Sequence, residues 1–364
     1  MSTCLFFVCK LKGYDIISII EEVNIMKCVS ISGQKSLVLK EMDKPVSKDG
    51  SVVIQVKSAG ICGSDIHNWD MGQPVGLVMG HEFAGVVVDP GSRKDLVKGD
   101  RVTGLPISPC GKCEACRTGN EQYCAETWSE AVGLALTNPG AYAEYTSCRP
   151  DMVRKIPSNV SYDDACMAEP AAVSLHAINL ANVKIGESVL IIGGGIIGLM
   201  AAEFARLAGA GYIAILETNK KRGRKAVNFG KINEYYDALK EDTVPKLLTK
   251  TNGGFDKVIE CCGNGPAVSE AFMLVRPGGT VVLVGVSAVP ITVPLVVPVM
   301  KEVTLQGAIA YKPEEFDMCL KLMSEKKINV SKYQDDFIGL DEAQEAFERL
   351  TNGKDSAIKI IFKP

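Results

Sequence analysis

A glycine-rich turn near the middle of the chain constrains the fold more than any other stretch. The apolar run Ser188–Ile192 leads into G-G-G-I-I-G at residues 193–198, and an alanine-rich segment follows. In a strand–turn–helix unit of this kind the glycines let a pyrophosphate approach the backbone, and the helix N-terminus offers free N–H groups to it. We therefore predict a dinucleotide site whose cofactor contacts include Gly193, Gly195, Ile196, Ile197 and Gly198.

A second apolar stretch supplies an acidic partner for this turn. Residues 212–216 are predicted to form a strand that ends in Glu217, which stands 19 residues beyond Gly198 and suits the hydroxyls of a ribose. This carboxylate would repel a 2′-phosphate, so NAD is favoured over NADP. The basic run at 220–222 could tolerate a phosphate and keeps NADP open as the alternative. Within that run, Arg222 is expected to cover the adenosine.

The region around these motifs predicts a doubly wound α/β domain. From about residue 174 to 310, apolar strands alternate with helical stretches, which indicates a parallel sheet. Residues 257–260 and 280–285 are its later strands, and the stretch at 281–286 could either lie inside the sheet or extend it across subunits. Further cofactor contacts are expected from Gly263, Val284 and Val286.

The rest of the chain predicts a second domain, as expected for 364 residues. Residues 26–173 show short strands separated by glycine and proline, typical of an irregular β-domain. The tail at 311–364 contains helical stretches and a closing apolar strand, and we expect it to return to this β-domain. Residues 1–25 fit this pattern poorly and are predicted to be an N-terminal extension.

Composition excludes several classes of protein. An apolar fraction of 46% with 23% charged residues is typical of a globular protein. The net charge of −3 argues against a nucleic-acid partner, and the lack of any uninterrupted apolar run of about 18 residues argues against a membrane span. Thirteen cysteines in so long a chain do not resemble a disulfide scaffold. We therefore predict a reducing compartment, the cytoplasm.

Four of these cysteines form the strongest local signal. They follow the spacing C-x2-C-x2-C-x7-C, at Cys110, Cys113, Cys116 and Cys124. Four thiolates close a tetrahedral zinc shell with no open position, which makes such a site structural. An iron–sulfur cluster is the chemical alternative, because similar spacings serve those clusters.

A second potential metal set is more dispersed. Cys62 lies in C-G-S-D-I-H, His81 and Glu82 lie in G-H-E, and Glu169 lies in A-E-P. Each motif alone is weak, but two of the three histidines of the chain fall within these motifs. Cysteine, histidine and glutamate together would form a mixed shell with room for water or substrate, as in a catalytic zinc site.

These motifs resemble a known family. C-G-S-D-I-H, G-H-E-F-A-G, the four-cysteine loop, A-E-P and G-G-G-I-I-G follow one another in the order found in zinc-dependent medium-chain dehydrogenases/reductases, within the polyol (sorbitol-like) and butanediol branch. The resemblance covers residues 26–364. It implies a GroES-like catalytic domain formed by residues 26–173 and 311–364, with a Rossmann NAD-binding domain at 174–310.

The resemblance also implies the roles of individual residues. Cys62, His81 and Glu169 would hold a catalytic zinc, with Glu82 beside the metal as ligand or water partner. Cys166 is the rival to Glu169. Zinc would act as a Lewis acid on the substrate hydroxyl.

Residues near Cys62 would then serve proton transfer. The hydroxyl of Ser64 would receive the proton of the substrate, and His67, which titrates near neutral pH, would pass it to solvent. Asp65 would orient the imidazole of a ligand. The third histidine of the chain, His176, is expected to be structural and packed between the domains.

The predicted reaction is hydride transfer between NAD and a secondary alcohol, that is a polyol, sugar alcohol or vicinal diol. Two alternatives remain open at this point: an enzyme similar to L-threonine 3-dehydrogenase, and a non-catalytic sensor that binds zinc and nucleotide. Family resemblance further implies a homo-oligomer, dimer or tetramer. Neither nucleic acid nor membrane is expected as a partner.

Overall fold

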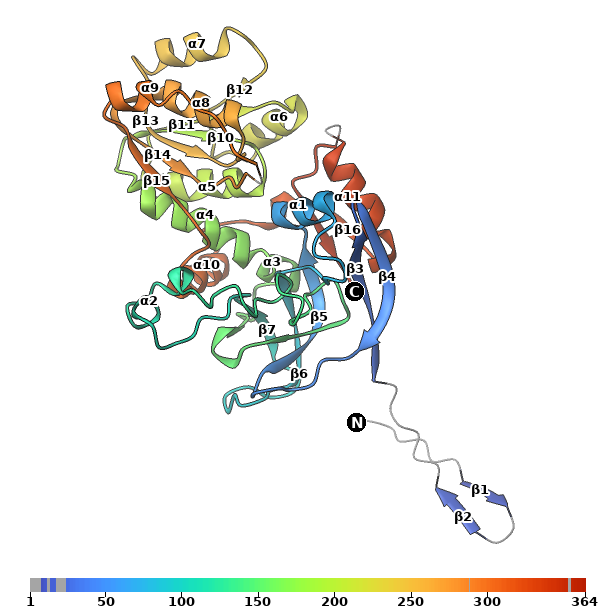
Figure 1. Ribbon diagram of the computed structural model, residues 1–364. Coiled ribbons are helices and arrows are strands. Elements are labelled where there is room, and N and C mark those ends of the chain that lie inside the picture. Colours follow the sequence, from blue (N-terminus) through green and yellow to red (C-terminus); the bar gives the residue numbers. More distant parts are fainter. Residues whose placement is uncertain (1–7, 12–13, 18–23, 288, 353–354) are drawn as a thin grey trace.

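Two large β-sheets carry the fold, and helices cover them (Figure 1). The computed structural model describes residues 8–11, 14–17, 24–287, 289–352 and 355–364. Among these residues, none of the helices has the length and apolar character needed to span a bilayer.

The first sheet has six parallel strands in the order β12-β11-β10-β13-β14-β15. Its strands are β10 (Ser188–Ile192), β11 (Tyr212–Glu217), β12 (Glu234–Asp237), β13 (Phe255–Glu260), β14 (Val275–Leu283) and β15 (Thr304–Gly307). The helices between them are α5 (Ile196–Leu207), α6 (Lys220–Asn228), α7 (Thr243–Lys250), α8 (Gly265–Leu274) and α9 (Val296–Met300). The predicted Rossmann topology is confirmed.

The strand order of this sheet reverses between β10 and β13. At such a switch point the loops after two neighbouring strands part, and the crevice at their carboxyl ends is the usual site for a dinucleotide. The glycine-rich turn follows β10 at this edge. The apolar stretch at 281–286 overlaps β14, which lies between β13 and β15, so this strand is interior and β15 forms the edge.

The second sheet has the order β16-β17-β5-β6-β7-β9, with β8 paired to β5. Its strands are β5 (Val52–Gly60), β6 (Glu82–Asp89), β7 (Arg101–Gly104), β8 (Tyr145–Cys148), β9 (Val153–Lys155), β16 (Gln334–Ile338) and β17 (Lys359–Phe362). A separate hairpin joins β3 (Ile25–Gly33) to β4 (Ser36–Asp43). The helices of this part are α1 (Gly63–Met71), α2 (Glu114–Arg117), α3 (Tyr162–Ala165), α4 (Ala168–Ala181), α10 (Pro313–Ser324) and α11 (Ala343–Thr351).

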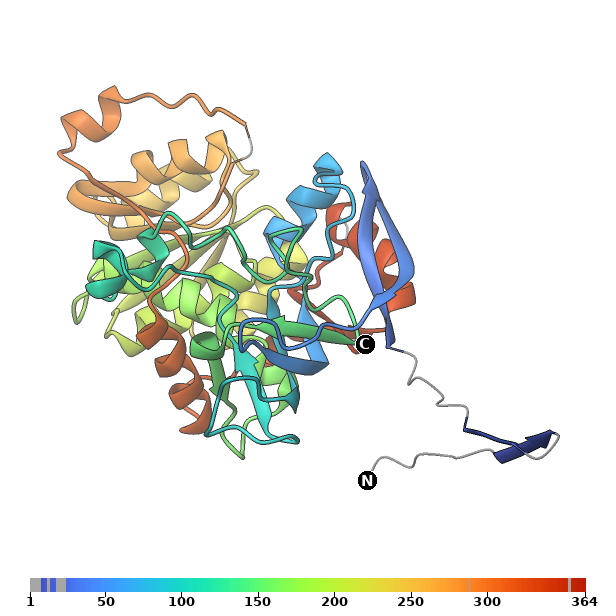
Figure 2. The ribbon, with the colours of Figure 1, turned by 60° about the horizontal axis from the view of Figure 1, so that its bottom comes forward.

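The C-terminal strand β17 lies in the interior of the second sheet, between β16 and β5. It pairs antiparallel with β5, and all four of its residues are buried. Both views show the red C-terminal helix α11 beside the blue β3–β4 hairpin (Figures 1 and 2). The two ends of the chain therefore build one unit around the second sheet.

The predicted N-terminal extension lies only in part within the described residues. There, β1 (Val8–Leu11) pairs antiparallel with β2 (Tyr14–Ile17). Figure 2 shows this hairpin apart from the two sheets. Residues 1–7, 12–13 and 18–23 lie outside the described residues.

Helices α4 and α10 are joined by a buried cluster around Glu315. One carboxylate oxygen of Glu315 lies 2.8 Å from Nδ1 of His176 and accepts a 2.8 Å hydrogen bond from the Lys312 amide. The other accepts from the side chain of Asn179 at 2.7 Å. Burial alone would raise the pKa of Glu315, but these bonds outweigh it and lower the pKa. His176 thus contacts a residue of α10 from α4, as expected of a residue that packs one helix on another.

Replacing Glu315 by glutamine is expected to lower the free energy of unfolding by about 2 kcal/mol at neutral pH, because the amide cannot accept all of these bonds. The native pKa of Glu315 is lowered, so its stabilising effect is complete above the ordinary glutamate value of 4.5. It fades as the pH falls through the lowered native value. Urea unfolding from pH 7 to pH 3 measures this; a difference between wild type and variant that does not shrink in acid would contradict it.

Candidate functional site

Three potential metal ligands meet where β5 ends and β6 begins. Cys62 is the N-cap of α1, just after β5, while His81 precedes β6 and Glu82 begins it. The antiparallel register sets Gly60 opposite Glu82, which brings the two chain segments together. One ligand atom from each of Cys62, His81 and Glu82 lies within 4.8 Å of the others.

The chemistry and burial of this group fit zinc. Thiolate, imidazole and carboxylate are the ligands that zinc takes in catalytic sites. His81 is 5% exposed and Glu82 is fully buried. Oε1 of Glu82 is buried and has no hydrogen-bond partner among the described residues. Buried polar atoms without partners are rare in proteins, so this group of side chains is suited to hold an ion.

A buried carboxylate stands behind His81. Asp65, on α1, is fully buried, and its Oδ1 lies 3.5 Å from Nδ1 of His81. Burial alone would raise the pKa of Asp65, but the charge of His81 and the hydrogen bonds that the carboxylate accepts together outweigh it and lower the pKa. The position of Asp65 is that of a group that orients an imidazole.

A buried lysine stands behind Glu82. Nζ of Lys359, on β17, donates to Oε2 of Glu82 and to the carbonyl of Ile61 at 2.7 Å. Burial alone would lower the pKa of Lys359, but the charges of Glu82 and Cys62 and the hydrogen bond to Glu82 together outweigh it and raise the pKa. Gly60 leaves room for the pair, because a Cβ there would lie 2.1 Å from Oε2 of Glu82.

Glu169 lies near this group but outside its 4.8 Å limit. It is 8% exposed and lies in the first turn of α4. Burial raises the pKa of Glu169 to about 7, with opposing effects of the charges of His81 and Glu82. The rival Cys166 is also outside the group; its thiol donates to the Asp163 carbonyl at 3.2 Å. Burial raises the pKa of Cys166, which disfavours the thiolate.

Ser64 and His67 lie on the exposed side of α1. The hydroxyl of Ser64 donates to Sγ of Cys62 at 3.4 Å, and both Ser64 and His67 are exposed. Residues three apart lie on the same face of a helix. The two side chains therefore lie one turn apart on α1, and that of Ser64 contacts a potential metal ligand.

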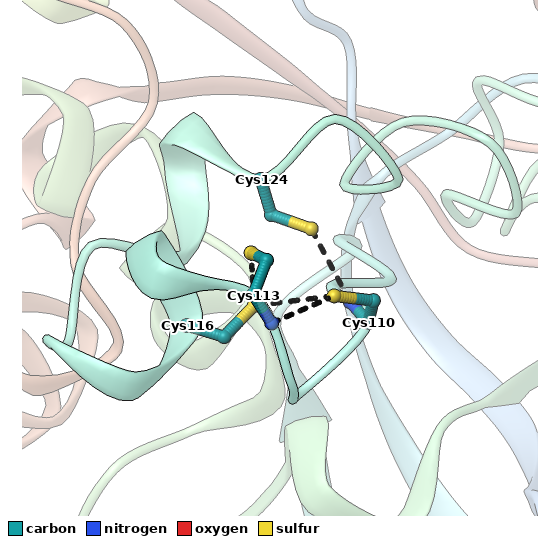
Figure 3. Close-up of side chains that lie close together, drawn as sticks. All are labelled: Cys110, Cys113, Cys116 and Cys124. Atoms are coloured by element: carbon teal, nitrogen blue, oxygen red, sulfur yellow. Dashed lines mark hydrogen bonds between the residues drawn. The ribbon is translucent and has the colours of Figure 1, made fainter.

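The four-cysteine group lies in the loop around α2, away from both sheets (Figure 1). The ligand atoms of Cys110, Cys113, Cys116 and Cys124 lie within 4.8 Å of one another, and their side chains converge (Figure 3). Hydrogen bonds from the amides of Lys112 and Cys113 lower the pKa of Cys110 to about 6. Such a set of thiolates is suited to a closed, structural zinc site.

The glycines of the turn after β10 have distinct roles. Gly193 has a φ of +102°, which a residue with a side chain rarely adopts. A Cβ at Gly198 would lie 2.0 Å from the carbonyl oxygen of Gly193, so this glycine lets α5 pack on the turn. At Gly195, the N-cap of α5, a Cβ would meet open space. That space, next to Ile196 and Ile197 at the helix N-terminus, can receive a phosphate.

Glu217 lies against this turn at the end of β11. Its Oε2 accepts a 2.6 Å hydrogen bond from the Gly194 amide, and its Oε1 accepts from the Asn219 amide at 2.8 Å. Arg222 lies in the first turn of α6, and its Nη2 donates to the carbonyl of Ala357. The Nε of Arg222 is buried and has no hydrogen-bond partner among the described residues.

The remaining predicted cofactor residues follow β13 and β14. Gly263 has a φ of +67°, and a Cβ there would lie 2.6 Å from the carbonyl oxygen of Val286. Val284 donates its amide to the carbonyl of Glu260. Cys262, which no sequence motif singles out, also lies against the turn, because a Cβ at Gly193 would be 2.7 Å from its Sγ. These residues and the glycine-rich turn share the carboxyl edge of the sheet.

Sequence reasoning also missed Lys359 and Tyr142. A single lysine within the apolar run 357–361 was a usable signal, because a charge buried in a strand needs a partner. Tyr142 is fully buried and donates its hydroxyl to Asp65. Nothing in its sequence context distinguishes it from an ordinary core residue.

Comparisons with known proteins identify the family of the chain. The chain matches two family models, "Alcohol dehydrogenase GroES-like domain" over residues 48–158 and "Zinc-binding dehydrogenase" over residues 197–325. It is 32% identical to "Probable D-xylulose reductase A" of Aspergillus clavatus over 87% of this chain and 91% of that protein.

Two solved structures extend the comparison. The 2R,3R-butanediol dehydrogenase of Bacillus subtilis has a TM-score of 0.83 and 30% identity, covering 93% of this chain and 99% of that one. A protein from Sinorhizobium meliloti, described as a zinc-binding dehydrogenase and bound to NADP, has a TM-score of 0.84 and 28% identity with the same coverage. These similarities favour neither the threonine-dehydrogenase-like alternative nor the non-catalytic sensor. The chain belongs to the zinc-type medium-chain alcohol and polyol dehydrogenases, with a GroES-like and a Rossmann-like part.

Proposed function

We propose that this protein oxidises a secondary alcohol of a polyol, sugar alcohol or vicinal diol to the ketone, with NAD as the hydride acceptor. Two features of the chain support this function. Cys62, His81 and Glu82 lie together as potential metal ligands, and a glycine-rich turn lies at the switch point of the parallel sheet. A metal site can supply a Lewis acid for the alcohol oxygen and a dinucleotide crevice can supply the hydride acceptor, which together suit oxidation of an alcohol.

Different residues would bind the metal and transfer the proton. Cys62, His81, Glu82 and Glu169 would hold zinc, which when bound supplies Lewis-acid polarisation of a substrate oxygen. Ser64 Oγ, beside Cys62, takes the proton of the substrate hydroxyl. His67, one helical turn further and exposed, releases it to solvent.

A substrate panel tests this function. Purified protein is assayed with NAD and with NADP against xylitol, sorbitol, 2,3-butanediol and L-threonine. We expect turnover of polyols or vicinal diols and none of threonine, because the similar proteins include a D-xylulose reductase and a 2R,3R-butanediol dehydrogenase. Turnover of threonine alone, or no turnover of any alcohol by zinc-loaded protein, would contradict the proposal.

We infer that NAD is preferred over NADP. A 2′-phosphate on the ribose would meet the carboxylate of Glu217, which is 7% exposed and hydrogen-bonded to the turn that faces the cofactor. Two negative charges that lie close together in a poorly hydrated site repel each other strongly. Arg222, the cation next to this site, already donates to the Ala357 carbonyl.

Replacing Glu217 by alanine is expected to shift the preference toward NADP. Loss of a charged hydrogen bond to the ribose costs about 1.5–3 kcal/mol, so kcat/KM for NAD should fall about tenfold or more, while kcat/KM for NADP should not fall. Because Glu217 also accepts from the Gly194 amide, Glu217→Gln serves as a variant of the same shape without the charge. If the ratio of kcat/KM for NAD to kcat/KM for NADP is unchanged in both variants, Glu217 does not select the cofactor.

We also propose a homo-oligomer formed through β15. This strand is the edge of the parallel sheet, and its Leu305 is 49% exposed. Val299 and Met300 in the adjoining α9 are 72% and 79% exposed. An unpaired edge next to exposed apolar side chains favours pairing with a second copy. Sedimentation as a monomer would contradict this.

We further propose that residues 26–173 and 311–364 form the catalytic domain and residues 174–310 the coenzyme domain. The two sheets support this division, since β17 belongs with β5 and β15 belongs with β14. A location in the cytoplasm is supported by the cysteines whose side chains the structure describes, none of which is in a disulfide.

A further inference from the structure

Tyr142 is a buried tyrosine whose hydroxyl points at a charged group. It is fully buried, and its hydroxyl donates to Oδ2 of Asp65 at 2.6 Å. The carbonyl of Gly60 lies 3.2 Å from the same hydroxyl. A phenylalanine would fill the same apolar space, so the hydroxyl has a function other than packing.

The two oxygens of Asp65 are used differently. Oδ2 accepts two hydrogen bonds, from the hydroxyl of Tyr142 and from the amide of Cys62 at 3.0 Å. Oδ1 accepts none among the described residues and lies 3.5 Å from Nδ1 of His81. The two donors fix the plane of the carboxylate, and its second oxygen is thereby directed at the imidazole.

The ring of Tyr142 is itself held in place. It packs on Phe362 with ring centroids 4.5 Å apart and on Phe347 at 6.2 Å. It also covers Gly80, the residue before His81, where a Cβ would lie 2.6 Å from the ring. These contacts fix the position of the hydroxyl, because the ring cannot move without displacing the segment that carries His81.

We propose that Tyr142 is a positioning residue for the metal ligand His81: its hydroxyl holds Asp65 so that Oδ1 faces Nδ1 of the imidazole, which leaves the other ring nitrogen for the ion. The inference rests on the proposed function of the Cys62 and His81 site. Groups that orient a ligating histidine typically change metal affinity 10–100-fold when removed. Tyr142 acts through Asp65, so its effect belongs at the lower end of that range.

The test measures zinc release, not only activity. Zinc-loaded protein is mixed with a chromogenic chelator, and Cys62→Ser identifies which phase of release belongs to the Cys62 site. In Tyr142→Phe we expect that phase to be about tenfold faster, with the phase of the four-cysteine loop unchanged. Tyr333→Phe is the matched control, because Tyr333 is equally buried and donates its hydroxyl to Glu203, away from the metal ligands.

A double-mutant cycle separates positioning from general destabilisation. If Tyr142 acts through Asp65, Tyr142→Phe should have no further effect on zinc release in an Asp65→Asn background. Equal release from wild type and Tyr142→Phe, or additive effects of the two substitutions, would overturn the inference. Asp65→Asn also tests the link on its own should Tyr142→Phe not fold, since unchanged release would refute it. A wild-type protein without a Cys62-dependent phase would refute the proposed function itself.

Discussion

Cys62→Ser is expected to lose alcohol oxidation by on the order of 10³-fold, because an ion held at this site supplies several kcal/mol to the reaction. A serine hydroxyl is a poor substitute for a soft thiolate ligand. The fold should remain intact, since Cys62 is the N-cap of α1 and serine is among the preferred residues at that position. The assay is steady-state turnover of the best substrate, with zinc content and circular dichroism measured on the same sample.

The matched comparison is Cys113→Ser in the four-cysteine loop. That variant should lose the zinc of the loop and some stability, while the zinc of the Cys62 site remains. Cys62→Ser should show the reverse pattern. Full turnover in Cys62→Ser would show that the metal assigned to the reaction is not needed for it.

Lys359→Met is expected to give the largest loss of stability, about 3–5 kcal/mol in the free energy of unfolding. Nζ of Lys359 is the hydrogen-bond partner of Oε2 of Glu82, and both side chains are at most 1% exposed. Methionine retains much of the length and apolar packing but leaves the carboxylate of Glu82 buried without a counter-charge. Urea unfolding of the metal-free proteins measures the difference.

Two variants make this result specific. Lys363→Met removes a lysine four residues further along, whose side chain is 40% exposed and pairs with Asp163; it should cost at most about 1 kcal/mol. Glu82→Gln combined with Lys359→Met should recover much of the loss, because the buried charge is then absent. Equal losses in Lys359→Met and Lys363→Met would contradict the account of a buried ion pair.

The coenzyme sheet could be predicted from sequence because its signals are local. A parallel strand is an apolar run, and the turn after β10 needs glycine at Gly193 and Gly198 for reasons of φ and close approach. Cysteine spacing within one loop is local in the same sense. For such features, neighbours in the chain are neighbours in space.

The groups behind the metal ligands could not be predicted, because they come from distant segments. Lys359 reaches Glu82 only because β17 inserts beside β5. Tyr142 reaches Asp65 across 77 residues. The sequence contains the residue types but not the pairing. Cys62 and His81, in contrast, could be named from their motifs, although the register of β5 and β6 is what brings them together.

The most direct test of the whole account is a crystal structure with NAD, using anomalous scattering at the zinc edge. We predict a zinc peak bounded by Cys62 and His81, next to the nicotinamide of a cofactor whose pyrophosphate lies on the turn at 193–198. Absence of metal between Cys62 and His81, or a nicotinamide bound far from it, would contradict the assignment of this chain as a zinc-dependent alcohol oxidoreductase.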